Sequence, residues 1–165
     1  MSIDFNFCTF VDNQSSQPGE TLYSSPGNTI NLNNSIIWMN SSSDPILPSI
    51  EIREDAVVNI TNSNIEGGES SVLFNPQNSG NSPILNWGSG NIDSNPLFCN
   101  IDDGDYSLFD ISPCVLGDGS YMGAIGIGCE AVFGCTDEYA DNYNPDANID
   151  DDSCFGYPSS GDYSL

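Results

Sequence analysis

Residues 30–37 read Ile-Asn-Leu-Asn-Asn-Ser-Ile-Ile, and the same order of residue types recurs at three other places in the chain. The other copies lie at residues 3–10, 58–65 and 85–92. Each copy begins with an apolar residue, an Asn or Asp and a second apolar residue. A small residue follows five positions after the first apolar one, and an apolar residue two positions later. The spacings are 27, 28 and 27 residues, measured along Asp4, Asn31, Asn59 and Asn86.

A fixed period of this length is typical of a solenoid, because each unit can bury its apolar side only against its neighbours. Within a unit, apolar and polar residues alternate, which is the spacing of a strand and not of a helix. The Asn and Gly positions interrupt the alternation, so we expect two short strands per unit, joined by a tight bend. The sequence therefore predicts an all-β parallel β-helix of about four coils. The alternative is a chance alignment in a chain rich in Asn and Ser.

The alignment of the copies predicts which side chains stack on one another. The first apolar residues form one interior column, the apolar residues seven positions later form a second, and the small residues form a third. Parallel stacking would place successive strands about 4.8 Å apart. The three expected columns are Ile3, Ile30, Val58 and Leu85; Phe10, Ile37, Ile65 and Ile92; and Cys8 as a buried free thiol with Ser35, Ser63 and Gly90.

The charge of the chain restricts its partners. The chain has 24 acidic residues and a single basic one, Arg53, which gives a formal net charge of −23. Phosphate recognition depends on Lys and Arg, so the composition excludes nucleic acid and disfavours an anionic membrane surface. No apolar run approaches the ~18 residues of a membrane span, so we expect no membrane insertion.

The cysteines indicate an oxidising compartment, either extracellular or at a cell surface. Six cysteines occur without a single histidine, which also rules out zinc fingers and Cys–His catalytic pairs. The first residues contain neither a basic segment nor an apolar stretch, so the chain itself carries no signal peptide. Interior positions begin already at Ile3, and an uncapped coil would expose an edge that aggregates. We therefore expect a fragment of a longer secreted protein, preceded by further coils and monomeric as part of that chain.

The motifs after Asn33 carry a family resemblance. Residues 34–40 read Asn-Ser-Ile-Ile-Trp-Met-Asn, and 90–98 read Gly-Asn-Ile-Asp-Ser-Asn-Pro-Leu-Phe. Gly-Asp-Tyr-Ser-Leu, Ser-Pro-Cys and Met-Gly-Ala-Ile-Gly follow at residues 104–108, 112–114 and 122–126. In order and spacing they resemble the last coils and cap of pectate-lyase-like right-handed parallel β-helix proteins secreted by marine bacteria. The resemblance implies that residues 1–128 are coils and cap. Cys99 and Cys114 share this cap, and we expect them to pair.

A second resemblance covers residues 134–154, which begin Gly-Cys-Thr-Asp, continue through Asn-Tyr-Asn-Pro and end Asp-Asp-Asp-Ser-Cys. This order is similar to a short repeat of adhesion-like and surface proteins of marine Bacteroidetes. It implies an acidic Cys-rich module at residues 129–156, closed by a disulfide between Cys135 and Cys154. Asp152 stands where the repeat usually has a Gly, which disfavours a positive-φ turn there. Residues 157–165 are then a linker or the start of a truncated next domain.

The density of acids in this module suggests a metal. Seven acidic residues and no basic one lie between Cys135 and Cys154, and hard oxygen ligands at this density suit Ca²⁺. Ile149 occupies the position of the EF-hand glycine, so the loop is not an EF-hand. The alternative is a solvated acidic loop ordered only by its disulfide. The expected calcium ligands are Asp137, Asp141, Asp146, Asn148, Asp150 and Asp152.

Catalysis within these residues is disfavoured. Lyase chemistry needs a basic residue as its base, and Arg53, flanked by Glu on its strand, keeps a compensated charge. The sequence thus favours a non-catalytic surface or adhesion module, with the β-helix as stalk and a calcium-stiffened spacer. The alternative is the tail of a polysaccharide-degrading enzyme whose active site lies upstream. The expected partner is a polysaccharide or cell-surface glycan, with Tyr23, Trp38 and Tyr106 as platforms against which a sugar ring stacks.

Overall fold

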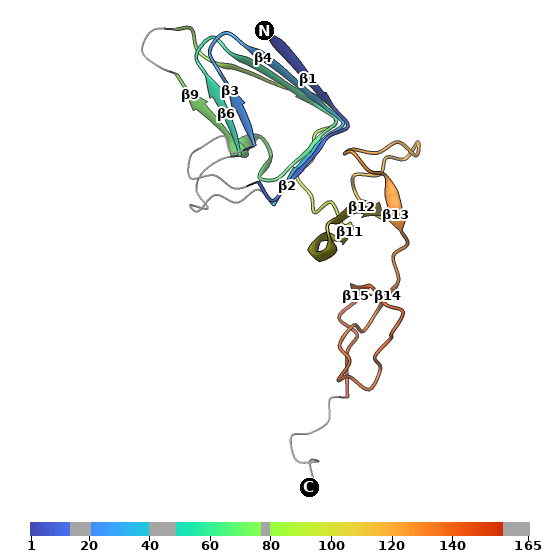
Figure 1. Cartoon of the computed structure of the whole chain (residues 1–165). Coiled ribbons are helices and arrows are strands. Elements are labelled where there is room, and N and C mark those ends of the chain that lie inside the picture. The colour runs from blue at the N-terminus through green and yellow to red at the C-terminus, as the bar shows by residue number, and fades with distance from the viewer. Residues whose placement is uncertain (14–20, 40–48, 77–79, 157–165) are drawn as a thin grey trace.

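The chain folds into an all-β structure in which parallel sheets stack coil upon coil, as Figure 1 shows. The structure is a computed structural model and describes residues 1–13, 21–39, 49–76 and 80–156. Three sheets have the orders β1-β4-β7-β10, β2-β5-β8 and β3-β6-β9, and every pairing in them is parallel. This is the order of a β-helix-like solenoid. The strands are β1 Ser2–Asn6, β2 Thr9–Val11, β3 Leu22–Ser24, β4 Thr29–Asn33, β5 Ile36–Trp38, β6 Ile50–Arg53, β7 Val57–Thr61, β8 Asn64–Ile65, β9 Val72–Asn75 and β10 Ile84–Trp87.

Two smaller sheets follow the solenoid. In the cap (residues 93–128, with Cys129 ending its last strand), β12 lies between β11, to which it is antiparallel, and β13, to which it is parallel. The acidic module has one short parallel pair. Short 3₁₀ helices lie before β9 and between β11 and β12. These elements are η1 Gly68–Ser71, β11 Phe98–Asn100, η2 Ile101–Asp103, β12 Asp105–Phe109, β13 Ile127–Cys129, β14 Phe133–Gly134 and β15 Ile149–Asp150.

The first predicted column is confirmed. In the first sheet, Ile3 pairs with Ile30, Ile30 with Val58 and Val58 with Leu85. The second column is confirmed as far as Ile65, because Phe10 pairs with Ile37 and Ile37 with Ile65. Strand pairing therefore fixes two interior columns. The first consists of Ile3, Ile30, Val58 and Leu85, and the second of Phe10, Ile37 and Ile65.

In the second and third predicted columns, the last member, Ile92 and Gly90 respectively, was wrong by one residue. Ile92 pairs with Asn64 and not with Ile65, and Asn91, not Gly90, contacts Ser63. The cause is the bend after β10, which holds one residue more than the bends of the preceding coils. Gly90, at φ 76°, permits this bend, since a Cβ there would lie 2.1 Å from Oδ1 of Asn62.

The first three coils each have a third strand that the repeat did not reveal. The sequence predicted two strands per unit, whereas β3, β6 and β9 form a further parallel sheet. Leu22 pairs with Ile50 at a spacing of 28, but Ile50 pairs with Val72 at a spacing of only 22. Because the number of residues between the second and third strands differs from coil to coil, these strands do not follow the fixed period.

The interior of the solenoid is a continuous apolar core. Leu32, Ile37, Ile52 and Ile60 are fully buried within it, and it includes residues from all three sheets. The first coil covers its interior least: Ile3 is 37% exposed, whereas Ile30 below it is 5% exposed. Burial of a complete isoleucine or leucine side chain stabilises a fold by about 1.5–3 kcal/mol, so these columns hold the coils together.

The cap lies against the outer face of the second sheet. Ile36 of β5 points outward and forms a second buried cluster with Leu108, Cys114 and Met122. The backbone N–H of Gly123 donates to the carbonyl of Asn34 at 2.8 Å, and that of Ala124 to the hydroxyl of Thr9 at 2.9 Å. The second sheet is therefore covered on both faces. Figure 1 shows β11, β12 and β13 beside β2, with β14 and β15 beyond them.

The disulfides confirm one predicted pair and correct the other. Cys135 is bonded to Cys154 as expected, but Cys99 is bonded to Cys129 and not to Cys114. Cys114 is a buried free thiol that accepts a hydrogen bond from the amide of Asn64. It therefore faces the solenoid, whereas Cys99 faces β13.

Candidate functional site in the acidic module and the pocket beside it

The outer face of the first sheet is lined by a ladder of amides. The side-chain amide of Asn86 donates to Asn59 at 2.6 Å, Asn59 donates to Asn31 at 2.6 Å, and Asn31 donates to the carboxylate of Asp4. Every amide in the ladder thus donates toward the first coil, and Asp4, a pure acceptor, ends the series. A hydrogen bond of this kind contributes about 0.5–1.5 kcal/mol, so the ladder links neighbouring coils from outside.

A second ladder runs through the bend between the first two sheets. The hydroxyl of Ser35 accepts from the backbone N–H of Cys8, and that of Ser63 accepts from the N–H of Ser35. The side chain of Asn91 accepts from Ser63 in turn. Cys8 is a free thiol on this ladder as predicted, but it is half-buried and not buried, since no described coil covers it.

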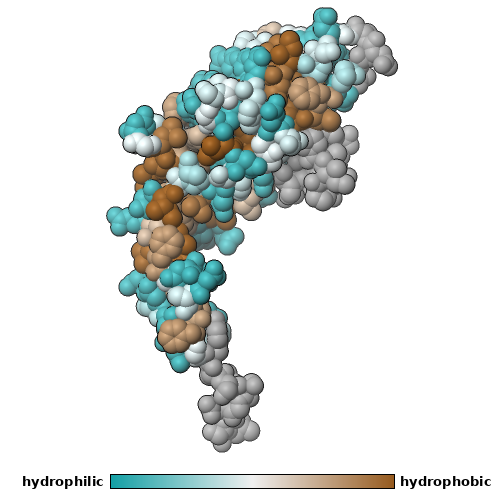
Figure 2. Space-filling view, turned by 180° about the vertical axis from the view of Figure 1, so that it is seen from behind, coloured by the Kyte–Doolittle hydropathy of each residue, from teal (hydrophilic) through white to brown (hydrophobic). Residues whose placement is uncertain are grey.

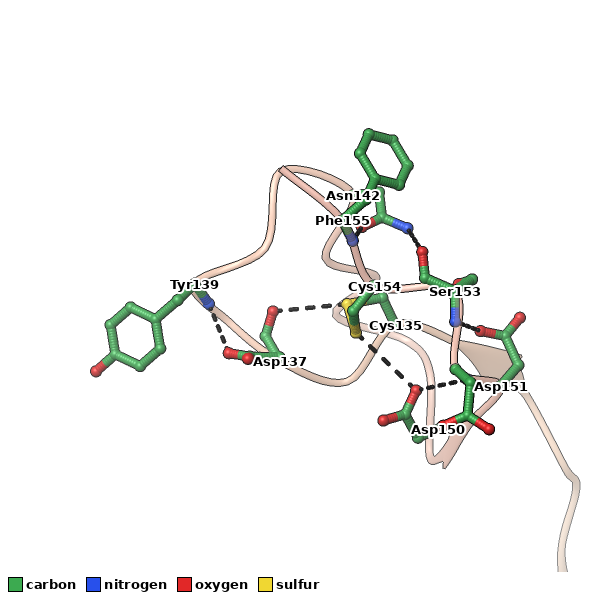
Figure 3. The surroundings of a disulfide bond; sticks show 10 residues. Cys135, Asp137, Tyr139, Asn142, Asp150, Asp151, Ser153, Cys154 and Phe155 are labelled. Atoms are coloured by element: carbon green, nitrogen blue, oxygen red, sulfur yellow. Dashed lines mark hydrogen bonds between the residues drawn. A yellow bond between two sulfur atoms is a disulfide. The ribbon is translucent and has the colours of Figure 1, made fainter. Parts of the chain in front are cut away.

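Side chains of the acidic module mostly bind their own backbone. The carboxylate of Asp137 accepts from the N–H of Tyr139, that of Asp150 from Asp152 and that of Asp151 from Ser153, all at 3.0–3.1 Å. These short loops are Asx turns, which set the chain direction without a core. Figure 3 shows these groups around the Cys135–Cys154 disulfide, with the ring of Tyr139 pointing away from it.

Two asparagines connect the loops of the module. The side chain of Asn142 donates to the carbonyl of Ser153 and accepts from the N–H of Phe155. Asn148 accepts from the N–H of Val132 at 2.8 Å and donates to the carbonyl of Glu130 at 2.9 Å. Both amides satisfy backbone groups that have no sheet partner. Sequence reasoning missed Asn142, although an Asn next to the Tyr-Asn-Pro motif is a common turn signal.

The turn at Asp152 has the positive-φ conformation that the sequence disfavoured. Asp152 has a φ of 60°, in the left-handed region where the similar repeat has glycine. Aspartate tolerates this region better than most residues because its short polar side chain can hydrogen-bond locally. The missing glycine has therefore not changed the path of the chain before Cys154.

The six expected calcium ligands are not assembled into one site. Within the described residues, no group of three or more Asp, Glu, Cys or His side chains is placed to share an ion. Asn148 is occupied by Glu130 and Val132, and Asp137 and Asp150 accept from backbone N–H groups. This arrangement does not fit a preformed calcium site, and binding would require the loops to rearrange. Calcium binding stays a prediction.

Arg53 is held in a cluster on the outside of the third sheet. Its guanidinium lies 3.2 Å from the carboxylate of Glu51 and 3.6 Å from that of Glu54, and 5.9 Å from the centre of the Tyr23 ring. Desolvation lowers the pKa of Arg53, but the hydrogen bond to Glu51 and the negative charges nearby outweigh it and raise that pKa. A guanidinium in this state cannot serve as a general base.

The three expected sugar platforms differ in their surroundings. Tyr23 is 49% exposed but pairs with Arg53, and Tyr106 packs edge-on against Phe98 at 5.6 Å. Trp38 is half-buried and lines a pocket of about 340 Å³. The three rings thus lie on different sheets, and Trp38 borders a pocket.

The pocket lies where the solenoid, the cap and the acidic module meet. The rings of Trp38, Phe98 and Phe109 contribute to its wall. The pocket could not be predicted from the sequence, because its walls come from segments more than 100 residues apart. Its lining residues are Trp38, Met39, Asn95, Leu97, Phe98, Ile101, Phe109, Asn148 and Ile149.

A scan against protein-family models and searches of curated proteins and of solved structures found no significant match. The likeness to pectate-lyase-like proteins and to the surface-protein repeat therefore rests on the motifs of this sequence. Among the residues that the structure describes, no helix has the length and apolar character to cross a membrane.

Proposed function

We propose that this chain is a non-catalytic module of a secreted bacterial surface or adhesion protein. In this proposal residues 1–128 are the right-handed, pectate-lyase-like end of a β-helix stalk, and residues 129–156 are an acidic spacer. The proposed partner is a polysaccharide or a cell-surface glycan, and the proposed location is outside the cell.

The observation that carries the proposal is that the polar side chains on the outer faces of the sheets are bonded to one another. In a catalytic β-helix this kind of face has to present acids and bases to a substrate. Here the ladder from Asp4 to Asn86 ties the polar side chains of the first sheet to one another, and on the third sheet Arg53 is neutralised by Glu51 and Glu54. Side chains bonded in this way stiffen the coils and have little capacity left for proton transfer.

Two rigid links support a role as stalk and spacer. The Cys99–Cys129 disulfide closes the cap beside the solenoid, and the Cys135–Cys154 disulfide closes the acidic module. Each loop of this size reduces the entropy of the unfolded chain enough to contribute about 3–4 kcal/mol. Disulfides also tolerate an oxidising exterior, where a small module without a core needs them.

Retention on polysaccharides, measured together with product release, tests the proposal. We expect the folded chain to be retained on at least one insoluble or gel-immobilised polysaccharide while releasing no reducing or unsaturated sugar ends. Heat-denatured protein is the control for both measurements. Release of new sugar ends above that control would favour a polysaccharide-degrading enzyme instead, and lack of retention on every matrix would contradict the adhesion role.

Calcium uptake by the acidic module is a separate part of the proposal. Because the proposed ligands are not preassembled, we expect weak binding, with a dissociation constant of about 10⁻⁴–10⁻³ M, as in extracellular calcium modules. Calorimetry on the whole chain should give a saturable heat that is lost when Asp146 and Asp150 are both changed to Asn. Sodium at matched ionic strength controls for screening of the high charge. Equal heats from the variant and the parent chain would leave an acidic spacer without a metal.

A further inference from the structure

The pocket beside Trp38 has the chemical character of a ligand site. At about 340 Å³ it falls within the ~300–1,000 Å³ typical of small-molecule pockets, which often form where structural units meet. Its wall is mainly aromatic and aliphatic, and three of the units of this chain contribute to it. β5 provides Trp38, the cap provides Phe98 and Phe109, and β15 provides Ile149.

The charge around the pocket restricts what can bind there. None of the described residues that line it is ionisable, whereas the chain as a whole carries a net charge of −23. An anionic ligand would be repelled by the surrounding field and would find no cation in the pocket to bind. The cavity is thus complementary to an uncharged ligand with an apolar face.

Two bulky residues of the wall are held in an uncommon backbone conformation. Met39 has a φ of 51° and Leu97 a φ of 53°, in the left-handed region that favours glycine. Leu97 is fixed there by an Asx turn, in which its N–H donates to the side chain of Asn95 at 3.0 Å, and by its carbonyl, which accepts from Phe109. Strain of this kind persists only where the surroundings fix it, so both residues hold their part of the wall in a fixed shape.

The rim of the pocket offers a polar group. Asn95 is exposed, its side-chain oxygen accepts from Leu97, and no described residue accepts from its side-chain nitrogen. This nitrogen is therefore a donor for a hydroxyl oxygen of a ligand. Aromatic residues in the wall and an amide donor at the rim match a neutral sugar ring, which has an apolar face of C–H groups and an equator of hydroxyls.

We propose that this pocket binds one ring of a neutral sugar chain. Trp38 and Phe98 contact the apolar face of the ring, and Asn95 donates to one of its hydroxyl groups. The inference rests on the proposed adhesion function and specifies its ligand class, because a pocket without charge excludes uronate and sulfated chains.

Tryptophan fluorescence tests the inference directly. The chain contains two tryptophans, so Trp87→Phe, which keeps an aromatic ring in the solenoid core, leaves Trp38 as the only reporter. The probes are neutral hexasaccharides of β-linked glucose, mannose and xylose, with oligogalacturonate as the charged comparison. We expect a saturable change in Trp38 emission with at least one neutral probe and none with oligogalacturonate at equal ionic strength.

The matched variant is Asn95→Asp, which retains the acceptor for Leu97 but replaces the rim donor with a charged acceptor. We expect it to weaken binding about tenfold, since an unmatched charge at a hydrogen-bonding position disfavours the complex. Asn6→Asp carries the same change of charge, also keeps its acceptor for Asn33, and lies on β1, outside the pocket. This control should bind as the parent chain does.

The outcomes separate the pocket from the wider proposal. No response of Trp38 to any neutral probe, together with retention on polysaccharide, would overturn the pocket and leave the adhesion function in place. Equal weakening by Asn95→Asp and Asn6→Asp would also overturn it, because the effect would then be one of net charge. No retention and no response would overturn both.

Discussion

The solenoid and the acidic module achieve order in opposite ways. In the solenoid, whole side chains such as Leu32 and Ile60 are removed from water, and polar ladders outside reinforce their stacking. In the acidic module, Tyr139 and Phe155 are 68% and 62% exposed, and order comes from a disulfide and Asx turns. Figure 2 shows the module as a narrow extension below the broader coils, with isolated apolar residues on its surface.

The two regions should therefore be sensitive to different substitutions. Apolar burial is spread over many residues, so the solenoid depends on its columns and tolerates changes outside them. The acidic module, residues 129–156, has 28 residues and cannot bury enough surface to fold by that means, so it depends on a few covalent and directional bonds. Four changes would test this contrast, in order of decreasing effect.

Removing a column residue should destabilise the solenoid most. Ile60→Ala deletes a fully buried side chain between Leu32 and Trp87, and we expect it to lower the free energy of unfolding by about 2–5 kcal/mol. The matched control is Ile84→Ala, at a side chain that is 50% exposed, with an expected loss of less than about 1 kcal/mol. Urea unfolding measures both. Equal losses would show that the interior columns do not dominate stability.

Opening the module disulfide should unfold the module and leave the coils intact. Changing Cys135 and Cys154 together to Ser should remove about 3 kcal/mol from the module, because the closed loop no longer limits the unfolded chain. Hydrogen exchange should then become fast over residues 133–156 while the amides of β4 and β7 stay protected.

The matched control for this change is Cys114→Ser, which removes a free thiol and no disulfide. Loss of protection in β7 along with the module would contradict independent ordering of the two regions.

Peptide mapping without reduction should also link Cys99 to Cys129 and leave Cys8 and Cys114 free.

Replacing one amide of the ladder with a carboxylate should have a smaller effect on the stability of the solenoid. Asn59→Asp replaces the donor toward Asn31 with an acceptor, so two acceptors face each other, and we expect a loss of about 1–2 kcal/mol. Asn6→Asp is the control, because Asn6 only accepts from its neighbour Asn33 and keeps that role. Thermal unfolding of both variants at neutral pH gives the comparison, and identical melting temperatures would indicate that the ladder does not stabilise the coils.

The smallest effect should come from removing a hydrogen bond to a carboxylate in the cap, that of Asp105. The side-chain and backbone hydrogen bonds from Ser107 lower the pKa of Asp105 below its usual 3.8. A lowered folded pKa stabilises the fold at pH values above the unfolded pKa, and this contribution disappears as pH falls through the folded pKa. Ser107→Ala should therefore raise the pKa of Asp105 and reduce the acid stability of the cap slightly.

Carbon NMR of the carboxyl groups measures this change. Asp118, whose pKa is lowered in the same way by Ser120, is the internal control and should titrate as before. An unchanged titration of Asp105 in the variant would contradict the assigned cause.

The features of this structure that depend on a local sequence pattern could be predicted from the sequence. The register of Ile3, Ile30, Val58 and Leu85 followed from the repeat, since an alternating strand has only two faces. The disulfide of the acidic module followed from its resemblance to a known repeat. Ile36 was harder to interpret: the run of residues 36–38 is apolar without alternation, which is typical of a strand buried on both faces.

Parts that depend on contact between distant segments were not accessible. Cys99 lies on β11 and Cys129 ends β13, on either side of β12, and the fold brings their Cα atoms to 6.0 Å from each other. Gly128 permits the close approach of β12, because a Cβ there would lie 2.1 Å from the hydroxyl oxygen of Ser107. Cys114, nearer in sequence, is instead buried against Asn64 of the solenoid. The pocket beside Trp38 likewise exists only because the cap and Ile149 approach β5.

Residue order alone was enough to predict the interior column from Ile3 to Leu85 and the column from Phe10 to Ile65. It could do so because the period of two along a strand and the period of 27 or 28 between coils are both written in residue order. Tertiary structure alone decided the cysteine partner in the cap, the second covered sheet face and the neutral pocket. These depend on distances between segments such as Thr9 and Ala124, which are 115 residues apart and carry no shared pattern.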